Sequence, residues 1–282
     1  MKICAFDIGI KHLSACIEED PVYNDQRELI YKEPSFWKVI NILDDAPICV
    51  EPMCTLPSKW KNEIGNPYCG RHKNRGKLLQ DMDEIHVRNV SEYTPFDIQH
   101  RLVSTLDKYP EIYDVDYIFI ENQDDNNPLM KSVASSVFTY YMKMAFVSPE
   151  NPRLKDIRYI NARKKTNNVP LIGGSYISQK KTGYDKRKDT SIEYCKRYIS
   201  KYCNHLLHFF ESHRKKDDLA DSYMTNKAGR WSLHFDSYTN LTVPNVLDVC
   251  ETHGISLVKE NGKKRTHKQL LKELKEHYIW IP

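Results

Sequence analysis

The sequence predicts a mixed α/β domain, and three observations point to this class. Two short apolar runs, at residues 2–6 and 12–17, are separated by a turn. After residue 94, helical patterns alternate with short strand-like runs, an order that is typical of sheets covered by helices. The 282 residues are 40% hydrophobic and 28% charged, which excludes wholesale disorder and leaves material for a sizeable core. The length suits one large domain or two smaller ones.

The N-terminal elements are predicted to be strands. Residues 2–6 alternate in polarity and end at Asp7, and the apolar run 12–17 follows after Ile8-Gly9-Ile10. This pattern predicts a hairpin that carries a carboxylate at the tip of its first strand. Residues 36–43 form a further strand candidate.

Helices and strands are predicted to alternate after residue 94. Thr94-Pro95 is a helix cap with a first-turn proline. We expect an apolar helix face from the residues that follow, namely Phe96, Ile98, Leu102, Val103 and Leu106. The remaining elements are a strand at 115–120 that ends in Glu121, a long helix at 128–147, a short strand at 157–160, and helices at 189–203 and 217–227.

The positive charge is concentrated in one segment. Lys and Arg total 42 against 38 Asp and Glu, so the net charge is only +4. Residues 153–188 carry eleven Lys or Arg and two Asp, a net charge of +9. With Gly173-Gly174 and Gly183, this segment has the composition of a mobile loop, and its charge favours a polyanionic partner.

The cysteine content and the lengths of the apolar runs indicate where in the cell the protein is located. The first apolar run is too short for a secretory signal, and no run reaches 18 apolar residues, so we expect neither export nor a membrane span. An intracellular, reducing location without disulfides is predicted. The eight cysteines would then be core residues or metal ligands.

Acidic residues lie where several predicted elements begin or end. Asp7 and Glu121 end strands, and Asp217, Asp218 and Asp221 begin a helix. Taken singly, each is a common turn or cap residue. Four carboxylates gathered in one place would repel each other unless hard cations such as Mg²⁺ or Mn²⁺ neutralised them. Two such ions beside a basic segment are what a nuclease requires.

Three motifs carry a family resemblance. Phe6-Asp7-Ile8-Gly9 with Leu13-Ser14, the run Ile118-Phe119-Ile120-Glu121-Asn122-Gln123, and the run from Lys215 to Ser222 (KKDDLADS) together resemble the RuvC-type Holliday junction resolvases, within the RNase H-like superfamily. The branch they resemble is the poxvirus and fungal mitochondrial one. The resemblance covers residues 1–235.

The resemblance implies an RNase H-like mixed sheet flanked by helices and a dimeric, metal-dependent endonuclease that cuts four-way DNA junctions in recombination and repair. Its implied ligands for two Mg²⁺ or Mn²⁺ ions are Asp7, Glu121, Asp218 and Asp221. Asp217, four residues before Asp221, stays an alternative to Asp218. The branch suggests a viral source and a cytoplasmic replication site or the nucleus. Part of the long helix at 128–147 would serve as a dimer interface, or its apolar face is simply core.

Basic side chains near the site are predicted to hold DNA phosphates. These are Arg163, Lys164, Lys165, Lys180, Lys181, Lys186, Arg187 and Lys188. For any one of them, a solvated surface charge is the alternative.

A Cys-rich insert interrupts the domain at residues 47–76. Cys49, Cys54, Cys69 and His72 have spacings that suit a tetrahedral structural Zn²⁺. A small segment with little core would gain from such a metal. The alternative is three buried thiols and an exposed imidazole.

The tail at 240–282 is predicted to be a helical extension. A helix beginning near Val243, a Gly254 turn, a basic loop (Lys263, Lys264, Arg265) and a second helix at 268–277 resemble a SAP-like DNA-binding module. The alternative is a helical hairpin packed on the catalytic domain.

Other functions are compatible with the same motifs. An RNase H-like nuclease acting on flaps or RNA–DNA hybrids would use the same metal site. A catalytically silent DNA-binding or virion structural protein on this fold is a third reading, against which the four intact acids argue.

Overall fold

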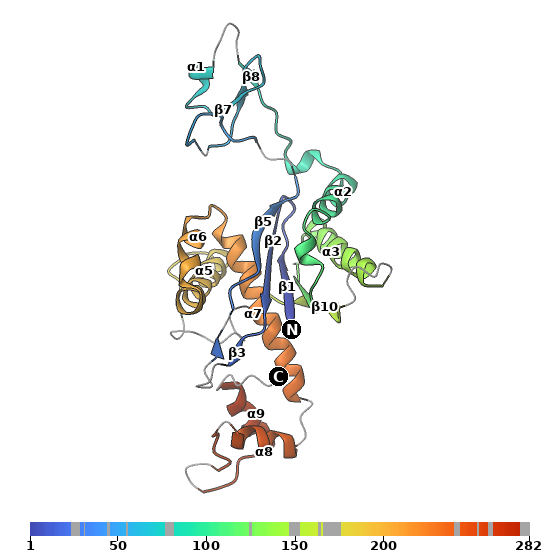
Figure 1. Cartoon of the computed structure of the whole chain (residues 1–282), viewed down its shortest axis with the longest axis vertical. Coiled ribbons are helices and arrows are strands. Elements are labelled where there is room, and N and C mark those ends of the chain that lie inside the picture. The colour runs from blue at the N-terminus through green and yellow to red at the C-terminus, as the bar shows by residue number, and fades with distance from the viewer. Residues whose placement is uncertain are drawn as a thin grey trace.

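A five-stranded mixed sheet lies at the centre of the computed structural model, with helices on both of its faces (Figure 1). The structure describes residues 1–23, 29–30, 32–43, 46–54, 56–76, 82–123, 126–146, 153–162, 165, 176–239, 243–252, 254–258 and 262–276.

The strand order of the sheet is β10-β9-β1-β2-β5. Strands β1, β2 and β5 form an antiparallel meander, and β9 and β10 run parallel to β1. This confirms the predicted fold class, a mixed sheet flanked by helices, and the predicted N-terminal hairpin. The strands are β1 (Lys2–Asp7), β2 (His12–Glu19), β5 (Phe36–Asn41), β9 (Tyr117–Glu121) and β10 (Asp156–Ile160).

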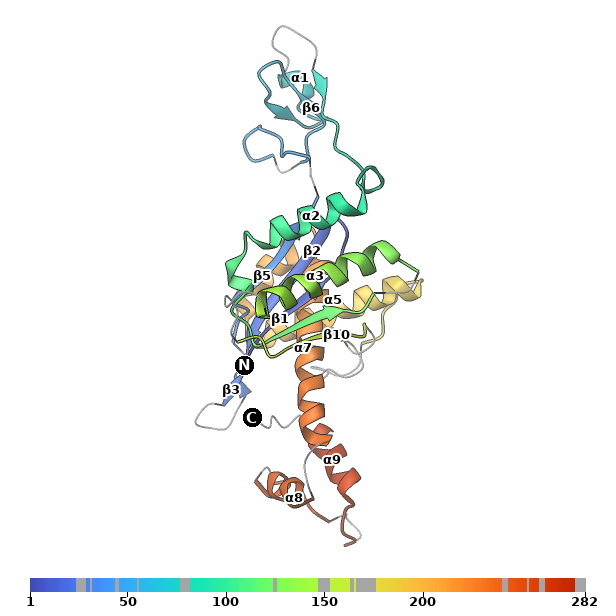
Figure 2. The ribbon, with the colours of Figure 1, turned by 90° about the vertical axis from the view of Figure 1, so that its right-hand side faces the viewer.

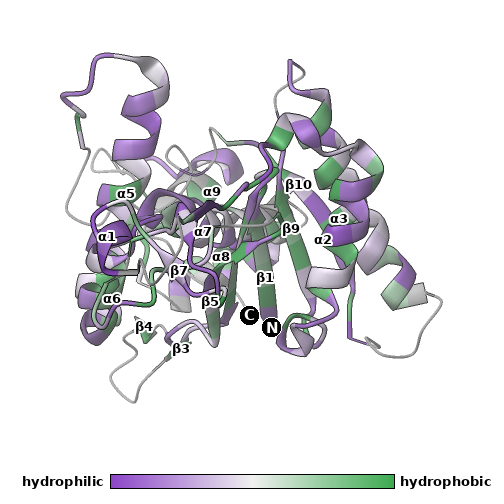
Figure 3. Cartoon of the chain, turned by 90° about the horizontal axis from the view of Figure 1, so that it is seen from above, coloured by the Kyte–Doolittle hydropathy of each residue, from purple (hydrophilic) through white to green (hydrophobic). Residues whose placement is uncertain are grey.

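Both faces of the sheet are buried. Along β1, Cys4 and Phe6 pack into one apolar cluster, while Ile3 and Ala5 pack into the other, and all four are fully buried. The strict alternation of side chains along a strand produces this division. Figure 3 shows the hydrophobic strands enclosed between the two helical layers.

Helices α2 (Pro95–Leu106) and α3 (Pro128–Phe146) cover the first face. The Thr94 side chain accepts a hydrogen bond from the backbone N–H of Asp97, which caps α2 as predicted. The core face of α2 is Ile98, Leu102 and Leu106, at four-residue spacing. Phe96 and Val103, predicted on this face, are instead 75% and 37% exposed, because they lie on other sides of the helix.

Helices α5 (Gly183–Tyr202), α6 (Leu207–Ser212) and α7 (Lys216–Thr239) cover the second face. Helix α5 begins six residues before the predicted start. Its cap is Thr182, whose side chain accepts a hydrogen bond from the backbone N–H of Asp185. The basic residues 186–188 therefore belong to a helix rather than to the predicted mobile loop.

Helix α7 crosses the sheet at very close range. A Cβ atom on Gly229 would lie 2.1 Å from the ring of Phe119, so only glycine permits this approach. The Asn226 amide donates to the carbonyls of Ile3 and Cys16, at 2.9 and 3.2 Å. These contacts hold the register of α7 against β1 and β2.

The Cys-rich insert is more regular than predicted. Strands β6 (Trp60–Lys61), β7 (Pro67–Tyr68) and β8 (Asp83–Glu84) pair in the order β7-β6-β8, and α1 spans Lys73–Gly76. The insert therefore reaches beyond residue 76. It follows β5 and leads into α2, and it stands at the opposite end of the molecule from the C-terminal helices (Figure 2).

The C-terminal helices α8 (Val243–Thr252) and α9 (His267–Glu276) pack on each other around a small core of their own, which includes Val246, Cys250 and Leu274. Gly254 ends the first of them with φ of 67°. The remaining elements are β3 (Val22–Tyr23), β4 (Leu29–Ile30) and the 3₁₀ turns Val90–Glu92, Pro110–Ile112 and Asn204–Leu206.

All eight cysteines carry free thiols. Within the described ranges, none of the helices combines the length and the apolar character needed to cross a membrane.

Candidate nuclease site

Two of the predicted acids lie at the same end of the sheet, where β1 and β9 terminate. Strands β1 and β9 are parallel neighbours, with Phe6 paired to Ile120, so Asp7 and Glu121 end adjacent strands side by side. Two residues earlier on each strand, Ala5 and Phe119 pack against α7. Because side chains alternate, Asp7 and Glu121 also point toward the α7 face.

Helix α7 supplies the third acid, and a lysine lies among all three. The ammonium nitrogen of Lys165 is 2.9 Å from Glu121 Oε2 and 3.2 Å from Asp221 Oδ1. The Lys165 side chain is only 5% exposed. The Ser191 hydroxyl, from α5, donates to Asp221 Oδ1 at 2.8 Å. We call Asp7, Glu121, Asp221 and Lys165 the acidic cluster.

The acidic cluster has more negative charge than its lysine can balance. Burial, and then the charge of Glu121, raise the pKa of Asp7 well above its usual range. Burial also raises the pKa of Asp221. Although burial opposes ionisation of Glu121, the charge of Lys165 and a hydrogen bond from Asp7 lower its pKa. Three carboxyl groups thus compete for one ammonium.

Asp217 and Asp218, at the start of α7, are each paired with a lysine of their own. Asp217 Oδ2 is 2.6 Å from Lys188 Nζ, and Asp218 Oδ2 is 3.5 Å from Lys215 Nζ. Lys188 also lowers the pKa of Glu121. The geometry therefore leaves the choice between Asp217 and Asp218 open.

The donor set fits a hard divalent cation. Its atoms are carboxylate oxygens from three elements, held at low exposure and with unbalanced negative charge. Mg²⁺ and Mn²⁺ prefer such oxygen ligands. Asp7, Glu121 and Asp221 could hold one ion between them, and a fourth acid from α7 would complete a second site.

Two hydrogen-bonding contacts beside the acids were not predicted from the sequence. Ser191 is 2% exposed and orients Asp221. Ser14, the register partner of Asp7, has its hydroxyl 2.8 Å from that of Ser222 on α7. Ser14 and Ser222 lie within the quoted motifs, whereas no spacing in the sequence points to Ser191.

The predicted phosphate-binding residues have different surroundings. Lys180, Lys181, Lys186 and Arg187 are exposed before and within the first turns of α5. Lys188 is half-buried and pairs with Asp217. Lys165 lies inside the acidic cluster rather than on the surface. Arg163 and Lys164 fall outside the described residues.

The predicted zinc ligands come together in the insert. The ligand atoms of Cys49, Cys54, Cys69 and His72 lie within 4.8 Å of one another. His72 Nδ1 is 3.5 Å from Cys49 Sγ and 3.6 Å from Cys69 Sγ, and Cys54 Sγ is 3.9 Å from Cys69 Sγ. Three soft sulfurs and one imidazole nitrogen are a donor set that Zn²⁺ prefers.

The basic loop of the C-terminal extension lies between α8 and α9. Lys263 and Lys264 are exposed there, and Arg265 is half-buried. The backbone N–H of Arg265 bonds to the carbonyl of Leu257, which ties the loop to the small helical core.

Fold and site define a mixed α/β protein with an acidic site at the carboxyl edge of its sheet. No family model matches the sequence. The chain is similar to the uncharacterized protein L451 of Acanthamoeba polyphaga mimivirus, at 32% identity over 197 residues. That match covers 63% of the chain and 45% of L451, so the chain spans less than half of the relative's length.

Solved structures with a similar arrangement have low sequence identity. The yeast mitochondrial Holliday junction resolvase Ydc2 matches at 16% identity and a TM-score of 0.44, over 84% of this chain and 83% of that one. The Fowlpox virus resolvase in complex with Holliday junction DNA matches at 18% and 0.38, over 83% and 99%. RuvC of Thermus thermophilus matches at 11% and 0.42, over 84% and 97%.

Proposed function

We propose that the protein is a metal-dependent endonuclease that resolves four-way DNA junctions. The observation that carries the proposal is the convergence of Asp7, Glu121 and Asp221 from two strand ends and a helix, around one buried lysine. The three sequence motifs that supply these acids are those that resemble the RuvC-type resolvases, which favours junction DNA as the substrate.

The acids would hold two Mg²⁺ or Mn²⁺ ions, with Asp218 as the fourth ligand. The chemistry that two such ions supply is activation of the attacking water and stabilisation of the leaving oxygen of a phosphodiester. Ser191 fixes the orientation of one Asp221 oxygen. The Lys165 ammonium balances part of the charge of Glu121 and Asp221, which reduces the repulsion between the acids.

Positive charge beside the site would bind the DNA backbone. The first turns of α5 carry the exposed Lys186 and Arg187, and Lys188 links this helix to Asp217 at the start of α7. Through the Lys188–Asp217 pair the start of α5 adjoins the start of α7, so a strand bound along α5 would lie near the acidic cluster. Lys180 and Lys181 extend the same basic surface, and we assign phosphate contacts to Arg163 and Lys164 as well.

The parts outside the catalytic domain would stabilise the fold or add affinity. We infer a domain at 1–235 that contains the zinc-binding insert, followed by a DNA-binding extension at 240–282. In the insert, Cys49, Cys54, Cys69 and His72 would fill all four positions of a Zn²⁺ ion, which leaves none for chemistry. The independent small core of α8 and α9 supports a separate module with Lys263, Lys264 and Arg265 facing DNA.

Symmetric cleavage of a junction requires two active sites, so we infer a homodimer. The mimivirus relative supports a viral source. With it we infer an intracellular place of action, at a cytoplasmic replication site or in the nucleus.

The decisive experiment compares substrates under one set of conditions. Labelled synthetic four-way junction, linear duplex, flap and RNA–DNA hybrid are each incubated with the protein and Mg²⁺ or Mn²⁺. We expect paired, symmetric cuts in the junction, which Asp7→Asn abolishes and Lys143→Gln, at an exposed site on α3, leaves intact. Cleavage of the flap or hybrid alone would reassign the substrate. Equal cutting by Asp7→Asn would remove the proposed site.

A further inference from the structure

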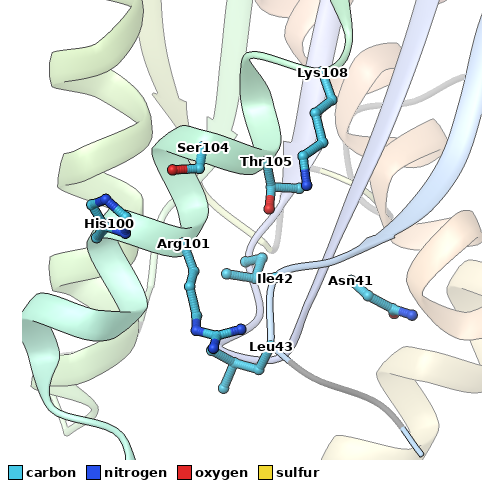
Figure 4. A pocket seen from close by; sticks show the side chains of 8 residues that line it. All are labelled: Asn41, Ile42, Leu43, His100, Arg101, Ser104, Thr105 and Lys108. Carbon is cyan, nitrogen blue, oxygen red and sulfur yellow. The ribbon is translucent and has the colours of Figure 1, made fainter. Parts of the chain in front are cut away.

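A polar pocket lies between the end of β5 and helix α2, outside the acidic cluster (Figure 4). Its volume is about 350 Å³. The side chains that give it its chemistry are Asn41, His100, Arg101, Ser104, Thr105 and Lys108. Every one of them can donate an N–H or O–H hydrogen bond, and none of the lining residues is acidic.

The sequence spacing of these donors along α2 and just after it explains why they lie together. His100 and Ser104 lie four residues apart on one side of α2, and Lys108 follows two residues after the helix ends at Leu106. Arg101 and Thr105 form a second pair beside them. The core residue Leu102 lies on a different face of the helix, so both pairs remain at the surface. The Arg101 guanidinium is also held 5.3 Å from the ring of Tyr93.

The pocket opens at the edge of the sheet that carries the acids. Asn41 pairs with His12 on β2, and Asp7 pairs with Ser14 two residues away on the same strand. Asn41 lies two strands across the sheet from Asp7 and two residues further along, which corresponds to about 12 Å between their Cα atoms. A duplex carries a phosphate on each strand for roughly every 3.4 Å of its axis. DNA that crosses this end of the sheet from the α7 side, where the acids point, to the α2 side would bring phosphates to the pocket.

We propose that this pocket binds a backbone phosphate of the nucleic acid that is cut at the acidic cluster, three to four nucleotide steps from the scissile bond at the roughly 3.4 Å spacing. The proposal rests on the proposed nuclease function and adds a contact that none of the sequence motifs contains. The ligand is a phosphodiester, for which a lysine ammonium, a guanidinium and two hydroxyls are suitable partners. Its role is to position the substrate arm on the α2 side of the sheet.

The test is equilibrium binding of a labelled four-way junction without added Mg²⁺ or Mn²⁺, so that no cleavage occurs and the proposed zinc of the insert is retained. The variants are Lys108→Gln, which removes a charge, and Ser104→Asp, which puts a negative charge into the pocket. Lys143→Gln on α3 is the matched control, since it removes one exposed charge elsewhere. We avoid Arg101 because its contact with Tyr93 gives it a structural role. Circular dichroism and thermal unfolding establish that each variant is folded.

We expect Lys108→Gln to weaken junction binding roughly three- to tenfold and to lower the slope of log K against log salt by about 1. Ser104→Asp should weaken binding further, and Lys143→Gln should match wild type. If wild type binds the junction and both pocket variants bind it with unchanged affinity and slope, the inference is overturned. If wild type binds no DNA, the proposed function itself fails, and that outcome is recognisable without any variant.

A second arm separates DNA from a free anion. Inorganic phosphate is added to wild type and to Lys108→Gln, and thermal unfolding is followed. Stabilisation of wild type alone by phosphate, together with unchanged DNA affinity of the pocket variants, would assign the pocket to a free phosphate and overturn the backbone contact. Weakened DNA binding with no effect of free phosphate supports it.

Discussion

Lys165 and Glu121 form an ion pair of 2.9 Å between Nζ and Oε2, with the lysine side chain 95% removed from solvent. The same ammonium reaches Asp221 at 3.2 Å. Lys165 therefore acts as an internal counter-charge for acids that come from β9 and α7. Its burial ties the chain after β10 to the centre of the site.

Removing this counter-charge should destabilise the metal-free protein. In Lys165→Met, Asp7, Glu121 and Asp221 lose their shared cation, and an unpaired buried charge typically costs about 3–5 kcal/mol. We expect a lower melting temperature in EDTA and a larger rise on adding Mg²⁺ than in wild type, since the ion would replace the lost charge. Lys180→Met, at an exposed position, is the control. Identical responses of both variants would contradict the role of Lys165.

Asp217 and Asp218 can be told apart by single substitutions. Asp218→Asn should reduce junction cleavage at least a hundredfold, as expected for loss of a metal ligand or its close support. Asp217→Asn should cost less, roughly tenfold, because its partner Lys188 binds it at the edge of the site. Cleavage rates at several Mn²⁺ concentrations measure both effects. The opposite order would assign the metal to Asp217.

The insert should contain zinc. Metal analysis of protein washed with a mild chelator is expected to give about one zinc per chain. Cys69→Ser should lose the metal and increase proteolysis between β5 and α2, since the insert has only a small core. Cys195→Ala, in the main core, should lower overall stability but keep the zinc. A zinc-free wild type would leave three free thiols and an imidazole in the cluster.

Asp116 should make stability depend on acid pH. Its carboxylate accepts the Lys2 backbone N–H at 2.7 Å and pairs with Arg153 at 3.1 Å. Although burial opposes ionisation, the Lys2 N–H, Arg153 and Lys155 lower the pKa of Asp116 below its usual value. A lowered pKa stabilises the folded state above the unfolded value of about 3.9, and this stabilisation is lost as the pH falls through the folded pKa.

Urea unfolding of Asp116→Asn at a series of pH values measures this contribution. We expect a loss of about 1–2 kcal/mol at pH 7 and a smaller difference from wild type near pH 3. Asp248→Asn, at an exposed position on α8, should show no such convergence. A constant difference between wild type and Asp116→Asn across the pH range would exclude the linkage.

Local patterns predicted most of the sheet and part of the site. The apolar runs before Asp7 and Glu121 mark β1 and β9 because a buried strand needs apolar side chains on both faces. The parallel pairing of those strands then brings the two acids together. The spacing of Cys49, Cys54, Cys69 and His72 predicted their convergence for a similar reason, since short loops limit their separation.

Contacts between distant segments were beyond the reach of local patterns. Lys165 lies in a run of basic residues, so the sequence predicts that it holds a DNA phosphate, whereas the packing of β9 and α7 around it buries it among the acids. Ser191 is one of two serines in α5, and only the approach of α5 to α7 pairs it with Asp221. Phe96 fits an apolar pattern but lies on the outer side of α2.

The close contact between Gly229 and Phe119 fixes the position of α7 along the sheet. This contact resists sliding and tilting of the helix. From Asp221, α7 continues without a break to Thr239, and α8 begins at Val243. From Asp221 to Thr239 the axial rise is about 27 Å at 1.5 Å per residue. A duplex that touches both the scissile position and α8 would need roughly eight base pairs at 3.4 Å each. For the proposed DNA binding, the length of α7 therefore sets the shortest duplex that can contact both the acids and α8.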